Sequence, residues 1–86
     1  MPEICRFFGI IIRMNFNDHV PAHFHADYAG RVASVGISPP RVIEGRVPPS
    51  VARRVLAWAS LHEMELLANW ERARRGVPPE RIPPLE

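Results

Sequence analysis

The sequence predicts an α+β domain in which an antiparallel sheet of three or four strands packs on one long C-terminal helix. Three observations lead to this prediction. Short segments rich in β-branched and aromatic residues follow one another from residue 7 to residue 47, with turn-forming residues between them. Apolar residues then recur at helical spacing between residues 47 and 76. The last ten residues contain four prolines and cannot continue that helix.

Length and composition indicate one small domain with one core. We assign residues 1–76 of the 86 to the domain and residues 77–86 to a Pro-rich tail. The single cysteine, Cys5, excludes an intrachain disulfide and zinc sites that need two or more cysteines. The net charge of +2 is weak evidence for nucleic-acid binding. Because we find neither a signal-peptide pattern nor an apolar run of about 20 residues, we expect a cytoplasmic protein that does not enter a membrane.

The first strand is predicted over residues 7–16. Its alternate residues divide into an apolar face (Phe8, Ile10, Ile12, Met14, Phe16) and a second face that becomes polar (Phe7, Ile11, Arg13, Asn15). Gly9 marks a bulge or a close backbone approach. After a turn at residues 17–23, a second strand is expected at 24–28, a third at 31–37 and a fourth, weakened by Gly45, at 41–47. The short turns between them favour hairpins.

Residues 47–76 predict the helix. Two prolines suit its first turn, Gly76 is a natural stop, and an inward stripe recurs at helical spacing (Val51, Val55, Trp58, Ala59, His62, Leu66). One helix of up to about 25 residues would overhang a four-stranded sheet. We therefore expect either a break near residues 60–62 or a partner over the far end. His62 is interpreted as a satisfied core histidine, and the tail as an extended segment that is flexible or lies along a surface.

The segment NDHVPAHFHADY, residues 17–28, holds three of the four histidines. In the predicted strand, alternation separates a polar row (His23, His25, Asp27) from a core set (Phe24, Ala26, Tyr28). His19 precedes the row in a loop that Pro21 stiffens. The chemistry of the segment therefore depends on what the polar row faces.

Three interpretations of this row stay open. As a metal site, His23 and His25 form an H-x-H pair with Asp27 or His19 as third ligand, a set that suits a divalent transition metal with one open position. As an acid–base site, one of the histidines acts near neutral pH with Arg13 as a helper. As a structural face, the side chains bond locally and leave a His/Arg surface for protein or RNA recognition. Apart from such a metal, we expect no cofactor.

Two stretches of the chain resemble a known family. The N-terminal part, MPEICRFFGIIIRMNFNDHVPAHFHADYAG, is similar to P-x-I-x-R-F-F-G-I-x-I-x-M followed by a D-H-x-P-x-H-F-H-A-x-Y box. The helix carries W-x-x-L-H and L-x-x-N-W elements. Together they resemble a widespread bacterial and archaeal family of small proteins described as a domain of unknown function, over residues 2–76. The box falls on Asp18, His19, Pro21, His23, Phe24, His25, Ala26 and Tyr28, and the helix elements fall on Trp58, Leu61, His62, Leu66, Asn69 and Trp70.

The resemblance assigns no role to these residues, but it implies a partner. Genes of the family often neighbour a second small gene, an arrangement similar to that of toxin–antitoxin modules. Our first hypothesis is therefore a small interaction module that binds the neighbouring gene's product, with self-association and nucleic-acid binding as further options. The second hypothesis is a small hydrolase or ribonuclease that uses His19, His23, His25 and Arg13, with or without a metal held by His23, His25 and Asp27.

Overall fold

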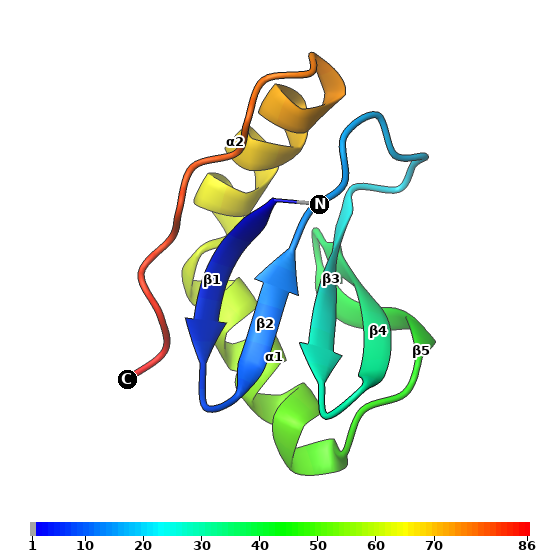
Figure 1. Cartoon of the computed structure of the whole chain (residues 1–86), viewed down its shortest axis with the longest axis vertical. Coiled ribbons are helices and arrows are strands. Elements are labelled where there is room, and N and C mark those ends of the chain that lie inside the picture. The colour runs from blue at the N-terminus through cyan, green and yellow to red at the C-terminus, as the bar shows by residue number, and fades with distance from the viewer. Residues whose placement is uncertain (1) are drawn as a thin grey trace.

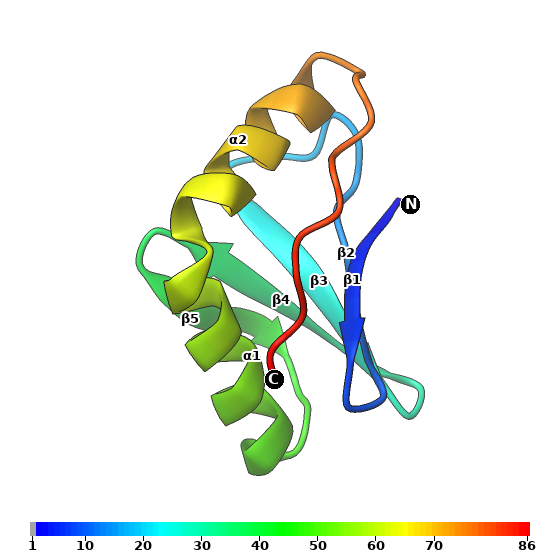
Figure 2. The same ribbon diagram turned by 90° about the vertical axis from the view of Figure 1, so that its left-hand side faces the viewer.

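The computed structural model describes residues 2–86 and contains one five-stranded antiparallel sheet followed by two helices (Figure 1). The strands are β1 (Glu3–Phe7), β2 (Ile10–Arg13), β3 (His23–Tyr28), β4 (Arg31–Ile37) and β5 (Pro40–Gly45), adjacent in chain order, and the helices are α1 (Pro49–Leu61) and α2 (Glu63–Arg74). Both helices lie on one side of the sheet (Figure 2). The α+β character is confirmed, but the prediction of three or four strands on one long helix is wrong.

The predicted strand over residues 7–16 instead contains the turn and the second strand of a hairpin formed by β1 and β2. The chain reverses at Phe8 and Gly9, which have φ of 50° and 76°, so that Phe7 pairs with Ile10 across β1 and β2. Tight hairpin turns with two positive φ values favour Asn or Asp at the first position. Here that position holds an aromatic residue, whose ring lies under the guanidinium of Arg54 at 4.6 Å. The apolar run therefore continues through the turn, and the residue type at position 8 does not indicate a turn in the sequence.

The predicted long helix is interrupted at His62, which has φ −122° and ψ 26°. Of the two alternatives for an overlong helix, the structure has the break near residues 60–62. The interruption is local, because the His62 N–H still donates to the carbonyls of Trp58 and Ala59 at 3.1 and 3.2 Å. The His62 ring is half-buried rather than in the core. Its Nδ1 lies 2.6 Å from a carboxylate oxygen of Glu65, so the ring is satisfied as expected.

The core lies between the sheet and the helices. Its sheet side is built from the predicted apolar alternation (Ile10, Ile12, Met14, Phe24, Ala26), all fully buried. On the helix side, Trp58 is fully buried with its ring centroid 5.5 Å from that of Phe7 and 5.7 Å from that of Phe24. Phe8 and Phe16 were expected on the same face but are exposed, because they lie at turns beyond the ends of β2.

The Pro-rich tail lies along the surface, which was one of the two alternatives. It runs back as an extended segment between the helices and β1 (Figure 2). The Ile82 N–H donates to the Ile4 carbonyl at 2.9 Å, and Ile82 is itself buried. Among residues 2–86, neither helix is long and apolar enough to cross a membrane.

Candidate metal centre

A row of polar side chains crosses the sheet on the face that points away from the helices. The strand register places Arg13 opposite His25, His25 opposite Ser34, and Ser34 opposite Glu44. Directly opposite residues project on the same side of a sheet. The row therefore runs over β2, β3, β4 and β5 and places a basic, an imidazole, a hydroxyl and an acidic group along one line.

A pocket of about 250 Å³ opens over part of this row. One wall is the loop between β2 and β3, and the other is formed by β3, β4 and β5. The lining residues are Asn15, Asp18, His19, Pro21, His23, His25, Ser34, Ile43 and Glu44. Seven of these nine residues carry a polar side chain, the exceptions being Pro21 and Ile43, so the pocket offers many groups that can bind a polar ligand.

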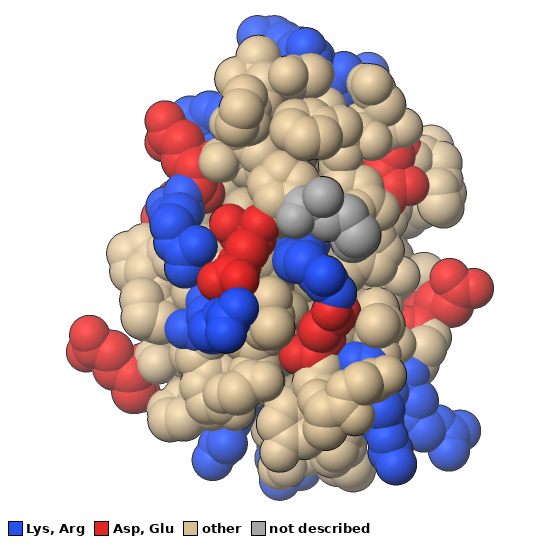
Figure 3. Space-filling view, in the orientation of Figure 1, with Lys and Arg blue, Asp and Glu red and all other residues tan. Residues whose placement is uncertain are grey.

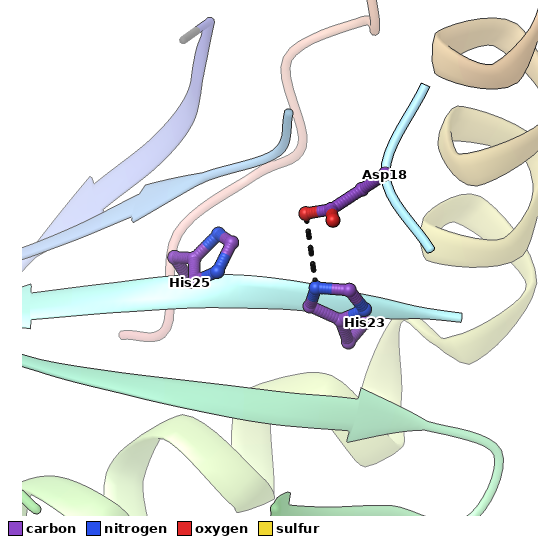
Figure 4. A group of neighbouring side chains, drawn as sticks. All are labelled: Asp18, His23 and His25. Carbon is purple, nitrogen blue, oxygen red and sulfur yellow. Dashed lines mark hydrogen bonds and ion pairs between the residues drawn. The ribbon is translucent and has the colours of Figure 1, made fainter. Parts of the chain in front are cut away.

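Three side chains converge within the pocket: Asp18 from the loop, and His23 and His25 from β3 (Figure 4). One ligand atom from each of the three lies within 4.8 Å of the others. The two imidazole rings meet edge to face, with centroids 5.2 Å apart. Two imidazoles and a carboxylate at this separation form a donor set that divalent transition metals accept.

The hydrogen bonds of His23 constrain its protonation. Its Nδ1 lies 2.7 Å from the carbonyl oxygen of Pro21, which can only accept, so Nδ1 carries a hydrogen. Its Nε2 lies 3.1 Å from Oδ2 of Asp18. A neutral ring with hydrogen on Nδ1 presents a lone pair at Nε2, and a lone pair facing a carboxylate oxygen needs a cation between them. That cation is either a second proton on His23 or a metal ion.

The carboxylate of Asp18 is held in place and ionised. Its Oδ2 accepts from the Asn15 amide at 3.1 Å, and its Oδ1 accepts from the His19 backbone N–H at 2.9 Å. Burial raises the pKa of Asp18, but these two hydrogen bonds and the neighbouring His23 and His19 outweigh it and leave the pKa below its usual value. Asp18 is therefore a charged, oriented ligand at neutral pH.

His25 has an unused nitrogen. Its Nδ1 is buried and finds no hydrogen-bond partner among residues 2–86. Burial, followed by the charge of His23, lowers the pKa of His25 below its usual value. The ring is therefore neutral at neutral pH, and a neutral imidazole with a free nitrogen is the form that binds metal.

The structure brings together only some of the residues predicted from the sequence. His23 and His25 lie together, and His19 stands at the mouth of the pocket with its side chain 83% exposed. Asp27 does not join them, because it forms an ion pair with Arg13 on the same face of the sheet and neither residue lines the pocket.

Asp18 occupies the position that sequence reasoning gave to Asp27 or His19. The sequence places Asp18 in the predicted turn at residues 17–23. Its signal in the sequence was its place as the first residue of the D-H-x-P-x-H-F-H-A-x-Y box, and its turn role explains why a metal-ligand role was not assigned.

Charge is mixed on one face of the molecule. On the face shown in Figure 3, acidic and basic side chains lie among one another over the described residues. A surface that binds nucleic acid usually gathers basic side chains into one patch or stripe. This face therefore adds nothing to the weak evidence from the net charge.

Comparison with known proteins identifies the family of the chain. Neither a curated protein nor a solved structure matches the chain significantly. Residues 9–71, which include β2 to β5, α1, the pocket and most of α2, match the family model described as Domain of unknown function (DUF4160). Because this match covers most of the chain, the protein belongs to the DUF4160 family.

Proposed function

We propose that Asp18, His23 and His25 bind a divalent transition metal ion and that the chain is a small metal-dependent hydrolase. The observation that carries this proposal is the pairing of His23 Nε2 with Asp18 Oδ2 while Nδ1 donates to a backbone carbonyl. Histidines that bind metals commonly donate their second ring N–H to a carbonyl or carboxylate in this way, which fixes the tautomer.

The spacing of the donors supports a single ion. Donors around a tetrahedral ion with bonds of about 2.1 Å lie about 3.4 Å apart. His23 Nε2 and Asp18 Oδ2, at 3.1 Å, are close to this spacing already. One donor atom from each of Asp18, His23 and His25 lies within 4.8 Å of the others. His25 would close the rest of the gap by a small side-chain rotation, since its Nδ1 has no hydrogen bond to give up.

Three protein ligands leave at least one coordination position for water or substrate, which is the pattern of catalytic zinc sites. A bound ion would lower the pKa of that water to about 7 and polarise a carbonyl or phosphoryl oxygen. Ser34 and Glu44 line the same pocket. Glu44 supplies a carboxylate that can accept a proton from the water, and the Ser34 hydroxyl can donate to a substrate oxygen.

Titration of the metal-free protein with Zn²⁺ by calorimetry tests the metal site. We expect one ion per chain, and at least a 100-fold weaker affinity in Asp18→Ala and in His25→Ala. Asp27→Asn is the matched control, because it removes a carboxylate from the same sheet face but outside the pocket, and it should bind like the wild type. Equal binding by wild type and Asp18→Ala, or loss of binding only in Asp27→Asn, would contradict the proposal.

Hydrolysis is tested with the zinc-loaded protein on p-nitrophenyl esters and on bis-p-nitrophenyl phosphate. We expect release of p-nitrophenol that disappears with a chelator and in Asp18→Ala. Glu44→Gln should bind zinc like the wild type but turn over at least 10-fold more slowly. Zinc binding without turnover of either substrate class would leave the metal site in place and contradict the hydrolase.

A second candidate function is the interaction module of a two-gene, toxin–antitoxin-like system. Leu61 and Met64 support it: they flank the helix break and are 71% and 82% exposed. Exposed apolar side chains on one part of the surface can take part in a contact with a partner protein. Co-expression with the product of the adjacent gene should yield a complex, and Leu61→Ser with Met64→Ser should weaken it. Absence of a complex, together with no effect on growth, would contradict this candidate.

A further inference from the structure

The tail is held through its backbone, as a bound peptide is. Asn69, which is 1% exposed, donates from Nδ2 to the Glu80 carbonyl at 2.8 Å and accepts at Oδ1 from the Glu80 N–H at 2.8 Å. Both backbone groups of one residue are thus bound by a single amide side chain. Such a pair of bonds recognises an extended backbone whatever side chain it carries.

Two further contacts continue this recognition along the tail. The indole Nε1 of Trp58 donates to the Pro83 carbonyl at 2.8 Å, and the Ile4 carbonyl of β1 accepts from the Ile82 N–H at 2.9 Å. The Ile82 side chain is buried in the core cluster, and Leu85 packs against that cluster. An indole N–H that binds a carbonyl in a proline-containing segment is one way in which aromatic grooves hold such peptides.

The fit between the tail and its groove is incomplete. A cavity of about 110 Å³ lies between α2 and the tail, lined in part by Asn69, Arg72 and Ile82. β1 is the outer strand of the sheet, and Ile82 makes the one backbone hydrogen bond found between the described tail and this strand. Most of the β1 edge is therefore left without a backbone partner. A longer extended segment could pair with more of it.

The family match covers the helix side of the groove. Trp58 and Asn69 lie within residues 9–71, which match the family model, whereas β1 and residues 77–86 both lie outside that match. The side chains that make the backbone contacts thus belong to the shared part of the chain.

We propose that the groove between β1 and the helices is a binding site for an extended segment of a partner protein, and that residues 78–85 occupy it as an intramolecular competitor. The segment would place an aliphatic side chain in the Ile82 position, followed by proline, with its backbone bound by Asn69 and Trp58. It would gain over the tail by pairing with the free edge of β1. This site is separate from the metal pocket and does not depend on the proposed hydrolase.

The tether sets how strongly the tail competes. A segment joined by a short linker has an effective concentration in the millimolar range. A free peptide of the same sequence therefore binds the wild type only when the tail opens. Its apparent affinity equals its intrinsic affinity multiplied by the fraction of chains in which the tail is open. Weakening the tail should uncover the groove and restore binding.

The test uses the full chain and a fluorescein-labelled peptide of residues 77–86, VPPERIPPLE, followed by fluorescence anisotropy. The variant Ile82→Ser with Leu85→Ser removes the tail's apolar anchors and leaves the groove intact. We expect it to bind the peptide at least 10-fold more tightly than the wild type. Adding Asn69→Ala to that variant should abolish the gain, as should replacing the isoleucine of the peptide with aspartate. Circular dichroism and thermal melting verify that each variant is folded.

Hydrogen exchange on the wild type gives a readout that needs no variant. The amides of Glu80 and Ile82 should exchange by local opening, with protection at least 10-fold below that of Phe24 and Ala26 in the core strand β3. Equal protection would mean that the tail leaves only on global unfolding, and this would overturn the proposal. So would a tail variant that binds the peptide no better than the wild type. A wild-type dimer that the tail variant loses would assign the groove to a second copy and overturn the partner assignment.

Discussion

Replacing His25 with phenylalanine should stabilise the metal-free protein while abolishing metal binding. The buried Nδ1 of His25 has no hydrogen-bond partner within the described chain, and burial already lowers the pKa of the ring. Leaving a buried polar group unpaired costs about 1–3 kcal/mol. Phenylalanine supplies a planar aromatic ring that can make an edge-to-face contact with His23, as His25 does at 5.2 Å, and it is favoured in strands.

The gain in the free energy of unfolding should lie near the lower end of this range. His25 is only half-buried at the side of an open pocket, so water reduces the penalty. We expect about 1 kcal/mol, which corresponds to a rise in Tm of about 4–8 °C for a domain of this size. With zinc at about 100 times its dissociation constant, the wild type should gain about 2.7 kcal/mol, and His25→Phe should gain nothing.

Urea unfolding at pH 7.5 with a chelator, and again with zinc, measures both effects. His19→Phe is the matched control: its side chain is 83% exposed, so its free energy of unfolding should change by no more than about 0.5 kcal/mol. If metal-free His25→Phe proves less stable than the wild type, the imidazole contributes to the fold, and the reasoning that its free nitrogen is kept for a ligand fails.

Three further perturbations test the fold and the charges of the pocket. Acid should reduce the urea midpoint first as the pH falls through 6.5, because His25 is protonated in the unfolded chain before it is protonated in the folded chain. The midpoint should fall again below pH 3.8, as Asp18 is protonated through its lowered folded pKa. A midpoint unchanged between pH 8 and 5.5 would contradict the first step. Gly45→Ala should cost more than about 2 kcal/mol by urea unfolding, because φ is +83° and the new Cβ would overlap the backbone carbonyl oxygen of Val32 in β4. Gly30→Ala, at φ +80° with open space around it, should cost only about 1 kcal/mol. Phe24→Ala should cost about 3–5 kcal/mol and leave little folded protein by circular dichroism, and a loss below 1 kcal/mol would show that the core assignment is wrong.

The two faces of β3 could be predicted from the sequence because alternation is a property of the strand itself. Phe24 and Ala26 are fully buried, and His25 lies on the opposite face beside the pocket. The same rule separated Ile12 from Arg13 on β2. Alternation assigns a residue to a face of the sheet whatever its partner strands are. The face assignments are therefore correct even though the strand boundaries were predicted wrongly.

The composition of the pocket depended on contacts that no local pattern encodes. The register of β2 and β3 brings Arg13 next to Asp27, and their ion pair withdraws that carboxylate from the histidines. Asp18 instead reaches them because the loop folds back over β3. Part of what holds the loop is a hydrogen bond of 3.2 Å from the Asn17 N–H to the Ala73 carbonyl in the last turn of α2.

His23 couples the pocket to the core, whereas Asp18 and His25 do not. Its ring is 5% exposed, bonds to the loop through Pro21 and Asp18, and lies 5.3 Å from the ring of Trp70 in α2. A substitution at His23 would therefore remove a ligand, release the loop and open a cavity beside α2 at once. Loss of function in such a variant could not be separated from loss of structure. Asp18 and His25 are less buried than His23, so substitutions there should disturb the fold less, and their metal binding can be compared directly with their measured free energy of unfolding.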